Sequence, residues 1–187
     1  AALAVGPGRV QVQTTVEVEG QGDDLRLYNT RAIRRIASEP EAARLIDALC
    51  RERAQAERWI PKASIDGGPF DLRVVVIAGR ATHIVVRVGR SPMTNLHLLN
   101  RRGDPEAVRR RMDPADWDAA MASCERAAGS FPDSLYAGVD LAIAAGFRRH
   151  AVLEINAFGD LLPGVVDGDG RSTHAAELDA AGVGRDA

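Results

Sequence analysis

The stretch FDLRVVVIAGRATHIVVRVG, residues 70–89, decides the fold of this chain. Two runs rich in valine and isoleucine flank a turn at Gly79 and Arg80, and such runs around a glycine turn are typical of an antiparallel hairpin. Three charged residues interrupt the apolar pattern, namely Asp71, Arg73 and Arg87. The stretch therefore predicts two paired strands that carry unexpected charge.

A second hairpin is predicted further along the chain. AGVDLAIA, residues 137–144, and HAVLEIN, residues 150–156, are apolar runs separated by a turn near Gly146 and Phe147. Side chains two residues apart in a strand project from the same face, so Glu154 and Asn156 point together. Pairing of the two runs places Asp140 opposite Glu154.

This opposition predicts a site. Like charges directly opposite each other destabilise a sheet unless a cation or a hydrogen-bond donor lies between them. Two carboxylates and an amide oxygen are hard ligands, of the kind that Mg²⁺ prefers when phosphate completes its shell. The alternative is that this face of the sheet is simply solvated, as one face of an antiparallel sheet often is.

The remaining pattern predicts an α+β fold with antiparallel sheets. The stretch RVQVQTTVEVEG, residues 9–20, alternates strictly between the two faces of a strand, and 25–36 read as the return strand. Ser38 and Glu41 read as a capping box for a helix to about residue 54, and residues 56–60 read as a short strand. Asp113 and Pro114 open an amphipathic helix, and the segment 91–105 reads as a polar loop.

Composition limits the classes of protein. The 187 residues are 45% hydrophobic and carry a net charge of -2, which suits a compact globule and argues against attraction to nucleic acid or a membrane by bulk charge. No apolar run approaches the roughly 20 residues that span a bilayer, so we expect a cytoplasmic protein. The chain starts with AALAV, without an initiator methionine, which indicates a fragment.

The cysteines and histidines predict neither a disulfide nor a zinc site. Cys50 and Cys124 fall on the apolar faces of expected helices, which predicts buried thiols without a disulfide. The four histidines lack partners at zinc-ligand spacing. They are His83, His97, His150 and His174.

The order of these elements resembles a known family. DLRVVVIAGR, a return strand with Arg87, then TNLH, AGVDLAI and LEIN are similar to the C-terminal half of an ATP-grasp ligase, of the ribosomal-protein glutamate ligase and glutathione synthetase type. The resemblance covers about residues 55–165. It implies an ATP-grasp fold with an incomplete N-terminal part. Residues 1–60 would be the remainder of the N-terminal subdomain, 61–166 the C-terminal subdomain with a metal site, and 167–187 a polar tail, either loose or a single short helix.

The resemblance also implies roles for individual residues. The metal ligands would be Asp140, Glu154 and Asn156, which would hold Mg²⁺, or Mn²⁺ in its place, against the ATP phosphates. Arg73 and Arg87 would be catalytic and face the γ-phosphate or the acceptor carboxylate. The residues that bind ATP would be the adenine hinge Glu57, Arg58, Trp59 and Ile60, then Asp71 at the ribose and Asn95 near the phosphates.

The implied activity is ATP-dependent ligation of a small-molecule or peptide carboxylate to an amine through an acyl phosphate. The family uses lysines and a glycine-rich loop in its N-terminal part, whereas Lys62 is the only lysine here. The resemblance places those elements before Ala1, so a missing N-terminal segment is an expected partner, with a homo-oligomer as the alternative. Met93 stands where relatives tend to have an arginine, which puts the phosphate contacts or the choice of substrate in question.

Two other functions remain open. One is a non-catalytic nucleotide-binding or interaction module of the same fold. The other is an RNA-contacting domain, suggested by arginine runs at residues 31–35, 101–102 and 109–111. Those runs lack interleaved aromatic residues, so we interpret them as solvated faces.

Overall fold

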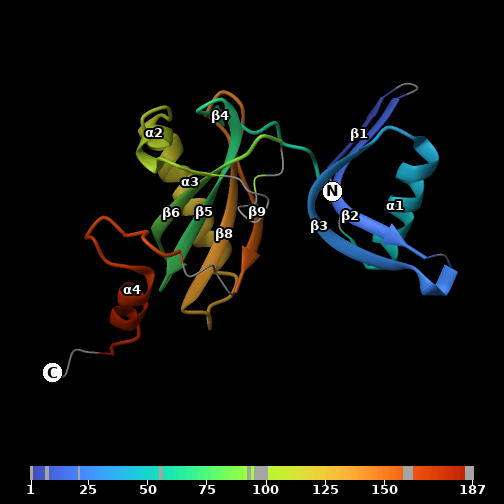
Figure 1. Cartoon of the computed structure of the whole chain (residues 1–187). Helices are drawn as coiled ribbons and strands as arrows, with labels where there is room; N and C mark the ends of the chain where they lie inside the picture. The colour runs from blue at the N-terminus through green and yellow to red at the C-terminus, as the bar shows by residue number, and fades with distance from the viewer. Residues whose placement is uncertain are drawn as a thin grey trace. The chain divides into compact units, whose positions relative to one another are not determined.

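The computed structural model describes residues 2–6, 9–20, 22–54, 57–91, 94, 101–157 and 162–183. The chain forms two compact units, Ala1–Trp59 and Ile60–Ala187 (Figure 1). The division falls one residue before the boundary expected after residue 60. The α+β class with antiparallel sheets holds for both units.

The first unit is a three-stranded sheet with one helix. Strands β1 (Ala2–Gly6), β2 (Arg9–Glu19) and β3 (Arg26–Ile36) pair antiparallel in the order β1-β2-β3, and the short 3-10 turn η1 (Gly22–Asp24) joins the last two. Helix α1 (Glu39–Arg51) packs on this sheet around a small core. Its buried members are Val12, Ile36, Ala42 and Leu45. The predicted strand pair and helix are confirmed.

Three local predictions in this unit are wrong. Ser38 occupies the N-cap position of α1 but makes no capping hydrogen bond with its side chain, while Glu41 pairs with Arg34 at 2.9 Å. Cys50 is exposed, because at about 100° per residue it lies well away from the buried face around Leu45. Residues 57–60 form no strand, since no described strand pairs with them.

The second unit contains the larger sheet. Its strands are β4 (Ser64–Ile65), β5 (Gly68–Ile77), β6 (Arg80–Val88), β7 (Arg101–Gly103), β8 (Tyr136–Ile143) and β9 (His150–Asn156). They pair antiparallel in the order β7-β6-β5-β8-β9, with β4 on β5. Both predicted hairpins, β5–β6 and β8–β9, are confirmed.

The first of these hairpins turns one residue earlier than predicted. Ile77 pairs with Arg80, so the turn residues are Ala78 and Gly79. Their φ angles are 48° and 79°, and two such residues in a row form the tight turn whose twist matches the flanking strands. Arg80 begins the return strand.

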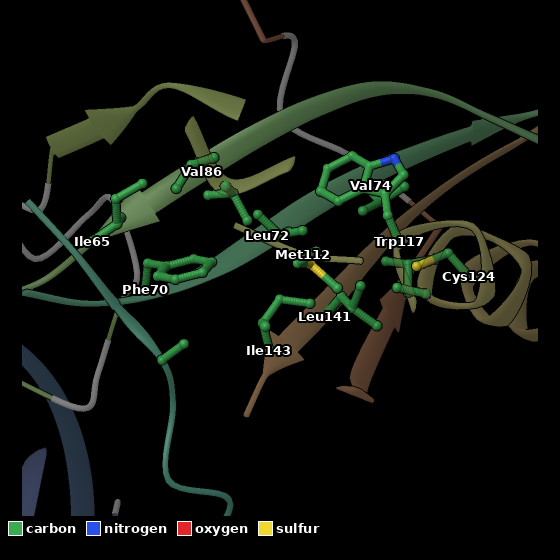
Figure 2. Packing of buried hydrophobic residues seen from close by; sticks show 14 of the residues in the cluster. Ile65, Phe70, Leu72, Val74, Val86, Met112, Trp117, Cys124, Leu141 and Ile143 are labelled. Carbon is green, nitrogen blue, oxygen red and sulfur yellow. The ribbon is translucent and has the colours of Figure 1, made fainter. Parts of the chain in front are cut away.

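The first face of the large sheet, which carries Leu72, Val74 and Leu141, packs against helical residues in the main hydrophobic core (Figure 2). Helix α3 (Pro114–Ala128) begins at Asp113, whose side chain accepts a hydrogen bond from the Ala115 N–H as an N-cap. Trp117 and Cys124 of α3 pack on side chains from β5 and β8, among them Leu72 and Leu141. Two elements, β7 and helix α2 (Pro105–Arg109), were not predicted, and β7 lies within the segment read as a polar loop.

The second face of the same sheet is divided. Val75, Ile77 and Val85 pack with Leu162 and Ala176, the latter on helix α4 (Thr173–Ala180). The single short helix expected in the C-terminal segment is therefore present. No helix in the described part of the chain is long and apolar enough to cross a membrane. The other half of the second face carries the charged residues.

Candidate functional site

Strand register brings the charged residues of four strands together. Asp71 on β5 pairs with Arg87 on β6, and Arg73 on β5 pairs with Asp140 on β8. Asp140 in turn pairs with Glu154 on β9, as the sequence predicted. Residues directly opposite in a sheet share a face. The side chains therefore gather on one face, beside the apolar half formed by Val75 and its neighbours.

Four of these side chains, together with Lys62 from the segment before β4, form a continuous chain of alternating charge, which we call the ionic network: Lys62, Asp71, Arg87, Asp140 and Arg73. Lys62 Nζ lies 2.8 Å from Asp71 Oδ2, and Arg87 Nε lies 2.7 Å from Asp71 Oδ1. Arg87 Nη2 lies 3.0 Å from Asp140 Oδ2, and Arg73 Nε lies 2.7 Å from Asp140 Oδ1. Each carboxylate thus joins two cations.

The network is buried. Asp71 is 3% exposed and Arg87 is 5% exposed, while Asp140 and Arg73 are also in the buried class. A charge in such a place is tolerated when it is paired and hydrogen-bonded, and removal of one partner from a buried pair typically costs about 3–5 kcal/mol. Burial alone would lower the pKa of Arg87, but Asp71 and Asp140 hold it above its ordinary value. The arginine remains charged.

Asp140 is the least satisfied member. Although Oδ1 lies 2.7 Å from Arg73 Nε, the two groups are not aligned, and neither atom has a hydrogen-bond partner among the described residues. Burial raises the pKa of Asp140 to about 6, against the lowering effect of Arg87 and Arg73, and Glu154 raises it further. This buried carboxylate oxygen therefore has an ion-pair partner but accepts no hydrogen bond from the described residues.

Glu154 lies opposite Asp140 on β9, where its side chain is exposed, and Asn156 follows two residues later on the same face of the strand. Asn156 Nδ2 donates a hydrogen bond to Glu154 Oε1 at 3.0 Å. This bond is the main cause that lowers the pKa of Glu154, although burial opposes it. Asn156 pairs across the strands with Gly138, which has no side chain to fill the space beside Asp140.

The oxygens of Asp140, Glu154 and Asn156 suit a divalent cation in number and type. Within the described ranges no three His, Cys, Asp or Glu side chains gather at metal-ligand spacing. A metal at this place would thus have two carboxylates and one amide, and would complete its shell with oxygens of water or phosphate, as Mg²⁺ commonly does. The Oδ1 of Asp140, which is ion-paired with Arg73 but accepts no hydrogen bond from the described residues, is the observation that favours the fit.

Asp71 is occupied within the protein. Its two oxygens take Arg87 on one side and Lys62 on the other, and Thr94 Oγ1 also donates to Oδ2. The expected contact of Asp71 with a ribose stays a prediction, and it would have to share a carboxylate that already accepts from three protein donors. The geometry favours Asp71 as a residue that positions Lys62 and Arg87.

The other residues expected to contact ATP belong to other parts of the chain. Glu57, Arg58 and Trp59 belong to the first unit, and their side chains are exposed, whereas Ile60 begins the second unit. Asn95 lies outside the described residues, as does Met93. The hinge and phosphate roles of these residues stay predictions.

Two members of the site were missed by the sequence reasoning. Lys62 and Thr94 make a hydrogen bond of 2.6 Å beside Asp71. Lys62 carried a signal, because it is the only lysine in a chain that otherwise uses arginine. Thr94 carried none, since an isolated threonine in a polar segment is common.

No protein-family model and no curated protein matches this chain. The function is therefore inferred from the ionic network and its surroundings.

Proposed function

We propose that this protein is an ATP-dependent, Mg²⁺-dependent carboxylate–amine ligase of the ATP-grasp type. The observation that supports the proposal most directly is the buried Asp140 Oδ1, without a hydrogen bond, beside Glu154 and Asn156. These oxygens suit a magnesium ion, and the cations of the ionic network lie on the same sheet face. A polyphosphate chain with its metal needs both kinds of group.

The charges of the network favour a phosphate ligand. Three cations, Lys62, Arg73 and Arg87, share this region with the buried carboxylates of Asp71 and Asp140, and the exposed Glu154 brings the number of carboxylates to three. Fixed cations in a nearly dry environment attract an anion much more strongly than the same cations do in water. Phosphoryl transfer depends mainly on such fixed charges, because it needs little covalent help from the protein.

The proposed chemistry has two steps. A substrate carboxylate oxygen attacks the γ-phosphorus of ATP, the bond to the bridging oxygen of ADP breaks, and an acyl phosphate forms. An amine then attacks the acyl carbon, inorganic phosphate leaves and the amine loses a proton, which gives an amide. Arg73 and Arg87 would orient the phosphoryl group and offset its charge, and Mg²⁺ held by Asp140, Glu154 and Asn156 supplies further charge neutralisation.

A second function also has support, namely a non-catalytic nucleotide-binding or interaction module. Both arginines already have carboxylate partners inside the protein, at Asp71 and Asp140. A network of this kind can serve to hold a sheet in a single register. Turnover separates the two functions, since the module would bind nucleotide or nothing and form no ADP.

Isothermal titration of AMP-PNP tests the proposal. We expect binding that requires Mg²⁺ and disappears with EDTA. Glu154→Gln should weaken it by roughly tenfold or more, because the substituted ligand loses its negative charge. Glu106→Gln is the matched control, since Glu106 is an exposed residue of α2 whose nearest cation is Arg109 at 3.7 Å.

Three results would count against the proposal. Absence of binding to the unchanged protein would contradict it, and so would equal affinity in the Glu154→Gln variant. Mg²⁺-dependent binding without ADP formation, in the presence of pooled amino acids as carboxylates and amines, would favour the non-catalytic module instead.

A further inference from the structure

Lys62 occupies a rigid position at the edge of the ionic network. The chain on both sides of it is tied to the end of β8, because Ala145 N donates to Pro61 O and Ala63 N donates to Ile143 O, each at 2.8 Å. Lys62 itself bridges to Ala144. The backbone thus fixes where this side chain starts.

The ammonium group is fixed as well, but only in part. Lys62 Nζ donates to Asp71 Oδ2 at 2.8 Å and to Thr94 Oγ1 at 2.6 Å. An ammonium has three N–H donors, and the third has no partner among the described residues. The side chain is 12% exposed. A donor that has lost most of its water without a replacement partner is costly, and an added acceptor relieves that cost.

The charge balance around Lys62 is also incomplete. Asp71 pairs with both Lys62 and Arg87. Arg87 also pairs with Asp140, and Asp140 pairs in addition with Arg73. Lys62 stands at one end of this series, and Glu154 stands beyond Asp140 toward the other end. The end at Lys62 therefore retains positive charge.

We propose that Lys62 is an oxyanion-binding residue, whose third N–H donates to a phosphate oxygen. Asp71 and Thr94 are then positioning residues that orient the ammonium. The proposal rests on the proposed function only in naming the nucleotide as the source of the phosphate. A free pyrophosphate offers the same chemistry without the nucleoside.

A lysine suits this position better than an arginine. The ammonium is a compact point charge with three donors, so it can satisfy two fixed acceptors and still present a third donor. The flat guanidinium is larger and directs its donors in a fork. We therefore expect that Lys62→Arg does not preserve the function of Lys62, even though all other residues among the 24 lysines and arginines of the chain are arginines.

The single lysine makes the test unusually direct. Protein grown with lysine carrying ¹³C at the ε position gives one lysine cross-peak, which belongs to Lys62. Pyrophosphate, AMP-PNP with Mg²⁺, and adenosine are titrated separately. We expect pyrophosphate and AMP-PNP to shift the peak in a saturable way, and adenosine to leave it in place.

Variants measure the contribution to affinity. Lys62→Met should weaken AMP-PNP or pyrophosphate binding by roughly tenfold, since a hydrogen bond to a charged group is worth at least that factor. Thr94→Val should weaken it less, because the ammonium keeps Asp71. Arg101→Met is the control, as Arg101 pairs at the surface with Asp66. Thermal unfolding of each variant checks that it is folded.

The outcomes separate this inference from the proposed function. If pyrophosphate shifts the Lys62 peak but nucleotides do not bind, the inference holds and the ligase proposal fails. If AMP-PNP binds while the peak stays in place and Lys62→Met keeps full affinity, Lys62 only supports the fold and the inference is overturned. It is also overturned if no phosphate compound moves the peak.

Discussion

At the scale of single residues, Asp71 is the carboxylate on which the network depends. It contacts Arg87, Lys62 and Thr94, and its side chain is 4% exposed. Removal of its charge leaves two cations facing each other in a nearly dry place. The stability of the unit should therefore respond strongly to this one position.

Asp71→Asn should lower the free energy of unfolding by about 3 kcal/mol, the lower end of the cost of breaking a buried pair. Asp66→Asn is a matched control, because Asp66 pairs with Arg101 where both side chains are 52% exposed, and such a pair contributes about 0–1 kcal/mol. Urea unfolding of the three proteins compares them. Equal losses in the two variants would show that Asp71 has no structural role and would reopen a ligand contact for it.

Asp140 predicts a dependence of stability on pH. Its pKa in the folded protein is raised to about 6 from an ordinary 3.8, so the folded state favours the protonated form. The stabilisation that the protonated Asp140 side chain gives the folded state is complete below pH 3.8 and is lost as the pH rises through 6. The pKa of Glu154 is lowered from 4.5, so its contribution is present above pH 4.5 and is lost below it, outside the window from 5 to 7.5.

Wild-type protein should therefore lose about 1 kcal/mol of unfolding free energy relative to Asp140→Asn between pH 5 and 7.5. The asparagine cannot ionise, so the variant lacks this dependence. Urea unfolding at the two pH values measures the difference. Parallel pH dependence in the two proteins would contradict the raised pKa.

The residue-scale prediction from sequence succeeded where the cause was local. The opposition of Asp140 and Glu154 followed from strand period and one short turn. By contrast, the engagement of Asp71 by Lys62 and Thr94 depends on segments 9 and 23 residues away in the chain. No periodicity encodes such a contact, so the sequence did not predict these two partners of Asp71, while the ribose role that the resemblance implies stays a prediction.

At the scale of elements, the two main helices begin in different ways. The Asp113 side chain accepts from Ala115 N at 2.9 Å, whereas Ser38 at the start of α1 makes no such bond. Both residues are common at N-caps. Sequence alone therefore cannot tell which of the two side chains is used.

Asp113→Ala should cost about 1 kcal/mol, the usual loss of an N-cap hydrogen bond, while Ser38→Ala should cost less than about 0.5 kcal/mol. Chemical denaturation, followed by circular dichroism, gives both values. A larger loss for Ser38→Ala than for Asp113→Ala would contradict the capping seen in the structure.

Elements with a strong pattern were predicted correctly, and weak ones were not. The valine-rich β5 and β6 and the alternating β2 have clear periods. Strand β7 is three residues long and consists of Arg101, Arg102 and Gly103, so it forms because β6 offers a free edge to pair with. Its own residues have little strand preference.

At the scale of the whole molecule, the central fact is the position of β5. It pairs with β6 through a local turn and with β8 across more than fifty residues of sequence. The two hairpins were predictable, but nothing in either predicts that they join through β5 and β8. That junction sets Arg73 opposite Asp140 and creates the ionic network.

We propose that this face of the larger sheet binds a metal–nucleotide complex. Mn²⁺ is paramagnetic and broadens the NMR signals of nearby residues, so Mn²⁺ with AMP-PNP reports where the complex lies. We predict that the backbone signals of Asp140, Glu154 and Asn156 disappear first. Broadening centred instead on the acidic segment Asp167–Asp179, or none at any residue, would contradict the claim.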